Sequence, residues 1–404
     1  MVQRQIKKQV FGQAHVVRID SGPGWRGILE DEINEVLTSP LQTYKFVPEV
    51  RTDDEGLVVH NIDFRQFLEL PLRLLTASEI LLQLDTKHVG SFGEFESFIQ
   101  SIPWEIYLPA GASVKVRCQS YRSALYHEGK LDKMVLGVLH KKGFVTGGIP
   151  YYIRIEQKEN RCTAFLSINQ EPMFRRKYKT DLSHPASIQE HLAAAAIRWV
   201  WGKDPVDLIY APFAGSGTMV MESWLYAHKP PLDLWRPFPQ LQAMPDFPES
   251  TWNFIRGKLA KSEVQATPAR AVEWDNKGIE ALRTNLDYAS LAWPALKSAW
   301  EAIAEDFLGD TCPPQFKNIF LPLNPPYGLR LEENTEELYA RLGQWLHTGF
   351  QKDQRRFGFV LLADSKAFHA FEKGVGPQHM NGIQSFTQGG QHIRCVSFDI
   401  AAIP

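Results

Sequence analysis

The 404-residue sequence has few cysteines, no long apolar run and almost no net charge. The four cysteines lie far apart and form no C-x-x-C pair, so we expect neither a zinc site nor a disulfide framework. No apolar stretch approaches the ~20 residues that span a bilayer, and the N-terminal MVQRQIKKQV lacks the apolar core of a secretory signal. These absences predict a cytoplasmic protein without a metal or a membrane partner.

The net formal charge of −2 argues against a simple nucleic-acid binder. Residues 91–180 differ, because they contain 14 Lys and Arg against 8 Asp and Glu. A basic segment in a nearly neutral chain is typical of a module that contacts phosphates, and a solvated basic surface is the alternative interpretation.

The N-terminal part, to about residue 175, predicts one α+β domain or two small ones. Apolar residues at helical spacing predict helices over 24–37 and 92–102, and a further helix from about Leu131. Alternating or β-branched runs predict strands over 10–19, 113–120, 151–157 and 160–169.

The second half alternates strands with helices, which predicts a doubly wound, mostly parallel sheet. Ser187 and Glu190 form a capping-box pattern before a helix that Gly202 ends. Residues 229–249, rich in proline and aromatics, predict an ordered insertion packed on this sheet. The expected strands are 206–210, 269–274, 318–323 and 357–364, and the expected helices include 219–227, 275–289 and 335–350.

A glycine loop, APFAGSGT, connects the first of these strands to a helix. Gly215 and Gly217 allow a tight turn and a close approach of the backbone to a ligand. The following helix offers free N–H groups and the positive end of its dipole, which suit an anionic group. The loop is neither a P-loop, since no Gly-Lys-Ser/Thr follows, nor the dinucleotide motif G-x-G-x-x-G.

Three polar residues follow the next strands. Glu273 ends the second strand, where an acid can bind ribose hydroxyls or simply cap a helix. Asp306 follows the third, as an adenine-binding carboxylate or a plain turn residue. Asn324 ends the fourth strand in the stretch FLPLNPPYGLRL, whose prolines must stop the strand. That stretch is either a turn that ends the strand, with the Tyr327 ring covering the core, or a binding site. In a binding site, the Asn324 amide would accept from an amino group and the Tyr327 ring would stack on a planar base.

Together, the glycine loop, the second-strand acid and NPPY resemble the class I S-adenosylmethionine-dependent methyltransferases that act on exocyclic or amide nitrogen. FRRKYK (174–179) with HPASIQEHLAAAAI (184–197) resembles the segment before the catalytic domain of THUMP-associated RNA methylases. LYHEGKLDKMVLGVL and the IPWEIYLP–SVKV pair resemble the THUMP domain. PDFPESTWNFI resembles an insertion of bacterial 23S ribosomal RNA guanine-N2 methyltransferases.

The resemblance implies a ferredoxin-like domain over 1–78, a THUMP-like RNA-binding domain over 79–172 and a Rossmann-like methyltransferase domain over 173–404 with a mostly parallel seven-stranded sheet. It implies transfer of a methyl group from S-adenosylmethionine to guanine N2 of ribosomal or transfer RNA. The catalytic residues would be Asn324, Pro325, Pro326 and Tyr327. The cofactor-binding residues would be Ala211, Phe213, Gly215, Ser216, Gly217, Thr218, Glu273, Trp274, Asp306 and Asn324.

One residue departs from the family pattern, since Ala211 stands where the glycine loop usually begins with an aspartate. A missing carboxylate there predicts weak cofactor binding and leaves open an RNA-binding protein that has lost catalysis. A further alternative is an amino methyltransferase for adenine N6 or for a protein glutamine, and the basic N-terminal half argues against it.

Overall fold

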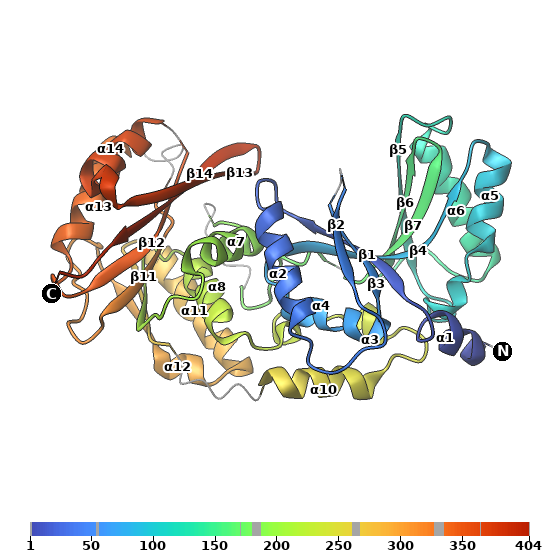
Figure 1. Ribbon diagram of the computed structural model, residues 1–404, viewed down its shortest axis with the longest axis horizontal. Helices are drawn as coiled ribbons and strands as arrows, with labels where there is room; N and C mark the ends of the chain where they lie inside the picture. The colour runs from blue at the N-terminus through green and yellow to red at the C-terminus, as the bar shows by residue number, and fades with distance from the viewer. Residues whose placement is uncertain are drawn as a thin grey trace. The chain divides into compact units, whose positions relative to one another are not determined.

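The computed structural model describes residues 2–53, 56–169, 171–179, 187–260, 267–326, 335–363 and 365–403, and the chain forms two compact units (Figure 1). The first unit comprises Met1–Ser21, Glu30–Met173 and Pro237–Leu259. The second comprises Gly22–Leu29, Phe174–Arg236 and Ala260–Pro404.

The first unit is built on one seven-stranded sheet in the order β2-β3-β1-β4-β7-β6-β5. Strand β4 pairs antiparallel with β1 on one side and with β7 on the other, so a single sheet crosses the boundary expected near residue 78. The division into a ferredoxin-like and a THUMP-like part therefore stays a proposal. The strands are β1 (His15–Ser21), β2 (Glu49–Thr52), β3 (Leu57–Ile62), β4 (Ala77–His88), β5 (Val114–Tyr121), β6 (Tyr151–Lys158) and β7 (Arg161–Ser167).

Helices α5 and α6 lie side by side near the β5 end of this sheet (Figure 1). Helix α5 begins with a capping box, in which the Ser91 hydroxyl accepts from the N–H of Glu94 and the Glu94 carboxylate accepts from the N–H of Ser91. The helices that lie wholly or mostly in this unit are α1 (Val2–Gln9), α2 (Arg26–Thr38), α3 (Phe64–Phe67), α4 (Glu69–Arg73), α5 (Phe92–Ser101), η1 (Trp104–Ile106), α6 (Glu128–Lys141), α9 (Pro239–Gln242) and α10 (Glu249–Ala260).

The aromatic insertion packs only in part as the sequence predicted. Residues 229–236 belong to the second unit, where the buried Trp235 ring meets the Trp224 ring edge to face, with centroids 6.4 Å apart. From Pro237 to Leu259 the chain belongs to the first unit instead. Phe238 and Trp252 are buried and meet edge to face, with ring centroids 6.2 Å apart. The segment thus buries its own rings as an ordered part of the first unit.

The second unit contains a mixed seven-stranded sheet in the order β10-β9-β8-β11-β12-β14-β13. Parallel pairings join β10 through to β12, whereas β14 runs antiparallel to both neighbours. This agrees with the predicted Rossmann-like fold. The strands are β8 (Leu208–Pro212), β9 (Ala269–Glu273), β10 (Trp300–Ala304), β11 (Asn318–Leu323), β12 (Arg355–Leu362), β13 (Met380–Gln388) and β14 (Gln391–Ile400).

Helices cover both faces of this second sheet. On one face, Tyr339 of α13 and Phe371 of α14 share a buried cluster with Leu321 of β11. On the other, the Trp201 ring at the end of α7 lies 4.7 Å from the ring of Phe320. The helices are α7 (Glu190–Trp201), α8 (Thr218–His228), η2 (Leu232–Leu234), α11 (Asn276–Ala292), α12 (Ala295–Ala299), α13 (Thr335–Thr348), α14 (Ser365–Val375) and η3 (Pro377–His379).

The predicted capping box before α7 was wrong. The helix begins at Glu190, and its N-cap residue Gln189 makes no side-chain cap bond. The Ser187 hydroxyl instead lies 3.1 Å from the Thr218 hydroxyl, and Glu190 forms an ion pair with Lys179 at 3.0 Å. Both residues of the motif are therefore committed to tertiary partners.

Candidate functional site

The loop between β8 and α8 curls tightly. Phe213, Gly215 and Gly217 have φ values of 61°, 54° and 92°, all in the left-handed region. Gly217 is the N-cap of α8, and a Cβ there would lie 2.8 Å from the Leu282 side chain. Only glycine combines that backbone conformation with that contact, so the loop requires Gly217.

The carboxylate of Glu273 ties the glycine loop to β9. Its Oε2 accepts the N–H of Gly215 at 2.7 Å, and its Oε1 accepts the N–H of Asp275 at 2.9 Å. Glu273 is only 7% exposed. The predicted cofactor acid is thus also the residue that positions the loop, which is more than a helix-capping role.

The glycine loop is also supported from α11. The side-chain amide of Asn285 donates to the backbone carbonyl of Ser216 at 2.9 Å. The Ser216 hydroxyl is buried and has no hydrogen-bond partner among the residues that the structure describes. Such an unsatisfied group beside the free N–H groups of the α8 N-terminus fits a polar ligand.

Asp306 and Trp274 lie at the same edge of the sheet. Asp306 is exposed two residues after β10, and its Oδ1 accepts the N–H of Leu308 at 3.1 Å, as a turn aspartate does. Trp274 directly follows Glu273 and is 60% exposed. An exposed indole beside this edge offers a flat face to a ligand.

Asn324 follows β11, which pairs with β8 at the centre of the sheet. The β8–β11 pairing ends at Ile209 and Phe320, whereas β8 stays paired with β9 as far as Pro212. The strand order also reverses between β8 and β11, and such a topological switch point is where α/β sheets bind ligands. Asn324 is half-buried and Pro325 is buried, while Tyr327 lies outside the residues that the structure describes.

Ala211 is fully buried in β8, opposite Ala271 of β9. Its position is the last but one of the strand, immediately before the loop that curls over the sheet edge. The methyl group therefore supplies packing and no polar contact at the point where the family pattern has a carboxylate.

Sequence analysis did not identify Glu222, a fully buried acid in the apolar helix α8, or its partners. It accepts two bonds from the Arg176 guanidinium, at 2.7 and 3.0 Å, and one from the Tyr178 hydroxyl at 2.6 Å. Burial, with the nearby Glu222 charge, raises the pKa of Tyr178 well above its usual value. A charge inside an apolar helix is the signal that could have predicted this pair, because buried charges need partners.

A second polar cluster joins three elements on the α13 side. Asp310 accepts from the Tyr210 hydroxyl at 2.5 Å and from the Arg270 Nε at 2.9 Å. Burial works to raise the pKa of Asp310, but the hydrogen bonds from Arg270 and Tyr210 lower it below its usual value. The loop after β10 is thereby anchored to β8 and β9.

Within the described part of the chain, no group of His, Cys, Asp or Glu side chains has the arrangement of a metal site. The same residues include no helix with the length and apolar character of a membrane span.

The second unit has a Rossmann-like fold, with polar residues at one edge of its sheet. The crystal structure of SMU.472, solved as a complex with SAH, superimposes with a TM-score of 0.76 at 18% identity and covers 97% of this chain and 99% of its own. The chain belongs to the family described as RMKL-like, methyltransferase domain, whose model matches residues 176–381, half of the sequence.

Two curated relatives carry names that concern RNA. A protein of Synechocystis sp., provisionally named an RNA methyltransferase, is 23% identical over 67% of this chain and 72% of its own length. The ribosomal RNA large subunit methyltransferase K/L of Methylococcus capsulatus is 24% identical over 84% of this chain. The aligned region spans 47% of that longer protein, so the match concerns part of it.

Proposed function

We propose that the chain is an S-adenosylmethionine-dependent RNA methyltransferase that forms N2-methylguanosine in ribosomal or transfer RNA. Membership of the RMKL-like family supports methyl transfer, and the names of the two relatives support RNA as the substrate. The SAH bound by SMU.472, a protein of the same fold, supports S-adenosylmethionine as the methyl donor.

One observation carries the proposal: Glu273 joins the glycine loop to β9 at the edge where Asn324 also lies. The N–H groups at the start of α8 suit the carboxylate of the methionine moiety, and the unsatisfied Ser216 hydroxyl offers a further polar contact. Glu273 would share its carboxylate with the ribose hydroxyls, and Asp306 would accept from the adenine amino group. The residues present therefore fit the cofactor.

S-adenosylmethionine supplies an electrophilic methyl group on its sulfonium. The Asn324 side-chain carbonyl and the Pro325 backbone carbonyl would accept from the exocyclic amino group and orient its nitrogen. Pro326 stiffens this loop, and Tyr327 would stack on the base. Catalysis then depends mainly on proximity and orientation, with no nucleophilic side chain. The target base must be single-stranded or flipped out of its stack.

The second candidate is an RNA-binding protein that has lost catalysis, and the buried methyl group of Ala211 favours it. The presence of Asn324 opposes it, as does the hydrogen bond by which Glu273 holds the glycine loop. The third candidate, an amino methyltransferase for adenine N6 or a protein glutamine, would use the same loop.

A methylation assay separates these candidates. The purified chain is incubated with radiolabelled S-adenosylmethionine and with ribosomal RNA or transfer RNA from cells that lack the protein, and the RNA is digested to nucleosides. We expect label in N2-methylguanosine, and none with Asn324→Ala. Asn253→Ala, at an exposed position of α10, is the control that should keep activity. Binding of SAH without any labelled nucleoside would favour lost catalysis, and label in N6-methyladenosine would favour the third candidate.

A further inference from the structure

A row of hydrogen bonds leads to the N-terminus of α8. The Lys179 ammonium group donates to the Ser187 hydroxyl at 2.8 Å, and the Ser187 hydroxyl lies 3.1 Å from the Thr218 hydroxyl. Thr218 is buried and is the first residue of α8, directly after the glycine loop. These bonds, called the Lys179 hydrogen-bond chain, therefore join the segment before α7 to the end of the glycine loop.

The chemistry of the three groups sets the direction of these bonds. An ammonium group only donates, so the Ser187 oxygen accepts from Lys179 and the Ser187 hydrogen must go elsewhere. The Ile188 carbonyl, at 3.5 Å, lies at the limit of hydrogen bonding, whereas the Thr218 oxygen is closer at 3.1 Å. Ser187 therefore donates to Thr218, and the hydrogen of Thr218 is left for a further acceptor. Among the described residues, Thr218 Oγ1 has no other hydrogen-bond partner.

The position of Ser187 is fixed by residues on both sides of it. The side-chain amide of Gln388, at the end of β13, donates to the Ser187 carbonyl at 3.3 Å and accepts the N–H of Gln189 at 3.0 Å. The Lys179 ammonium group is held by an ion pair with the buried Glu190 at 3.0 Å. Because Ser187 and Lys179 are already held in place, a ligand that uses them would lose little conformational entropy on binding.

The ion pair with Glu190 also balances the charge of Lys179. Lys179 therefore acts on a ligand through its hydrogen bonds and not as an uncompensated cation. Hydrogen bonds in a chain polarise one another, so a hydroxyl that accepts such a bond becomes a stronger donor. The Thr218 hydroxyl is thus both oriented and strengthened as a donor.

The groups around Thr218 suit an anion. The Ser216 hydroxyl, two residues earlier, is 3% exposed and has no hydrogen-bond partner within the described part of the protein. Both hydroxyls lie at the positive end of the α8 dipole, next to its free N–H groups. S-adenosylmethionine carries one carboxylate, on its methionine moiety, and this carboxylate matches such donors.

We propose that Lys179 and Ser187 are positioning residues, which act through the Thr218 hydroxyl on the carboxylate of bound S-adenosylmethionine. Thr218 donates to that carboxylate, and the Lys179 hydrogen-bond chain keeps its hydrogen in this direction. The inference deepens the proposed function and rests on its assignment of the cofactor site. It also explains why Ser187 contacts Thr218 instead of capping α7.

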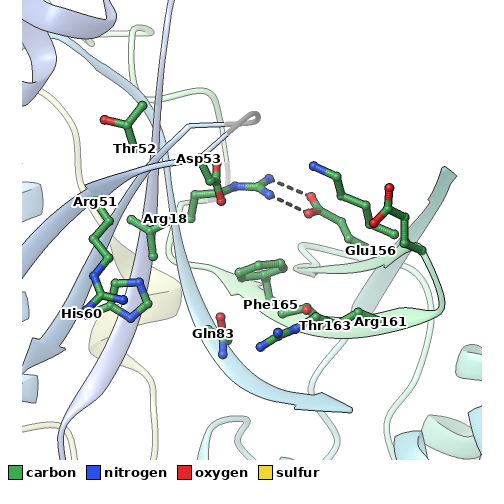
Figure 2. Close-up of a pocket in the computed structure, with 13 residues that line it drawn as sticks. Arg18, Arg51, Thr52, Asp53, His60, Gln83, Glu156, Arg161, Thr163 and Phe165 are labelled. Carbon is green, nitrogen blue, oxygen red and sulfur yellow. Dashed lines mark hydrogen bonds and ion pairs between the residues drawn. The ribbon is translucent and has the colours of Figure 1, made fainter. Parts of the chain in front are cut away.

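The first unit also contains a cavity with cations in its lining, of about 600 Å³ (Figure 2). The Arg18 guanidinium in this cavity donates two bonds to the Glu156 carboxylate, at 2.6 and 2.7 Å. Arg161, also in the lining, is exposed, and its Nε donates to the Thr86 hydroxyl at 3.2 Å. If the cofactor carboxylate bound in this cavity, its affinity would depend on Arg161, so Arg161→Gln is a control that should leave cofactor binding unchanged.

The test compares S-adenosylmethionine with decarboxylated S-adenosylmethionine, which lacks only the carboxylate, by calorimetric titration of the intact protein. Thr218→Val should weaken binding of S-adenosylmethionine at least about tenfold, because a hydrogen bond to a charged group is lost. Ser187→Ala should weaken it roughly threefold or more, because Thr218 loses the donor that orients and polarises it. Both variants should bind the decarboxylated compound as the parent does.

Conservative variants separate the hydroxyl from the shape of the side chain. Ser187→Thr and Thr218→Ser keep a hydroxyl and should restore most of the affinity for S-adenosylmethionine. Ser298→Ala, at an exposed position of α12, is the matched control for Ser187→Ala and should bind both compounds as the parent does.

The first donor of the hydrogen-bond chain is tested by Lys179→Met with Glu190→Gln, which removes the ammonium group without leaving a buried charge unpaired. This double variant should show the same selective loss as Ser187→Ala, and it tests the proposal independently if Ser187→Ala does not fold. Lys297→Met with Asp287→Asn removes an exposed ion pair of 3.3 Å and is its matched control.

Parent-like binding of S-adenosylmethionine by both Ser187→Ala and the Lys179 double variant would overturn the proposal. An equal loss of affinity for the two compounds would also overturn it, because a general distortion of the site does not select for the carboxylate. RNA methylation tests the proposed function separately. A parent that methylates RNA while the variants show no selective loss refutes the positioning role alone, and a selective loss without any methylation by the parent refutes the catalytic function alone.

Discussion

Removal of the Glu273 carboxylate should loosen the glycine loop. Glu273→Ala leaves the N–H groups of Gly215 and Asp275 without their present acceptor. Each hydrogen bond to a charged group contributes roughly 1.5–3 kcal/mol, so the loss of both should cost about 3 kcal/mol or more. Glu273→Gln keeps one acceptor oxygen and should cost roughly half as much.

Thermal unfolding measures this effect. For a unit of this size each kcal/mol lowers Tm by about 2–4 °C, so Glu273→Ala should unfold at least about 6 °C below the parent and Glu273→Gln between the two. Addition of SAH should raise the Tm of the parent and have little effect on either variant, because the loop that would bind it is no longer held. Glu280→Gln, at an exposed position of α11, is the control and should change stability by less than ~0.5 kcal/mol.

Two results would refute this role of Glu273. If Glu273→Ala unfolds within 2 °C of the parent, the two bonds do not hold the loop. If it is destabilised as expected but binds SAH with the affinity of the parent, Glu273 positions the loop without contacting the cofactor.

Three further predictions concern the same unit. Asn324→Ala should lower methyl transfer by at least about a hundredfold with little loss of Tm or SAH affinity, and activity within threefold of the parent would contradict its role. Ala211→Asp should tighten SAH binding about tenfold in calorimetry, since a charged hydrogen bond contributes roughly 1.5–3 kcal/mol, and equal or weaker affinity in a folded variant would show that Ala211 does not limit binding. Burial, with the Arg176 charge, lowers the pKa of His191 from 6.5 to about 3, so the folded state resists its protonation and stability should fall as pH drops below 6.5. Between pH 7 and 5.5, protonation of His191 in the unfolded state should lower the free energy of unfolding by roughly 1.3 kcal/mol. Urea unfolding of His191→Phe over the same pH range should therefore show a correspondingly smaller loss of stability than the parent.

Local pattern predicted the second unit well. Strand and helix periodicities located β8, β9 and β11 to within a few residues, because each depends on burial of one face or both. Glu273, Asp306 and Asn324 could be placed at one edge from the sequence, since parallel strands end on the same side. Their roles toward a ligand remain proposals.

The sequence alone did not predict which distant residues pair with one another. The pattern S-x-x-E before α7 read as a cap, yet Ser187 lies against Thr218 and Glu190 pairs with Lys179. Helix-capping propensity reflects only residues that are close in sequence. A side chain that forms a stronger hydrogen bond or ion pair with a distant residue no longer makes the local capping contact. The insertion from Pro237 was misplaced for the same reason, because composition predicts burial but not the surface that buries it.

Local sequence was sufficient to predict the alternation of strands and helices, the conformational need for glycine after β8, and the kinds of polar group at the strand ends. Tertiary structure alone decided that Glu273 holds Gly215, that Glu222 is matched by Arg176 and Tyr178, and that β4 carries one sheet through the whole first unit. The physical reason is the distance along the chain over which each kind of interaction acts. Backbone preferences and apolar periodicity act over a few residues, whereas a buried carboxylate is satisfied by whichever donor the folded chain brings within hydrogen-bonding distance.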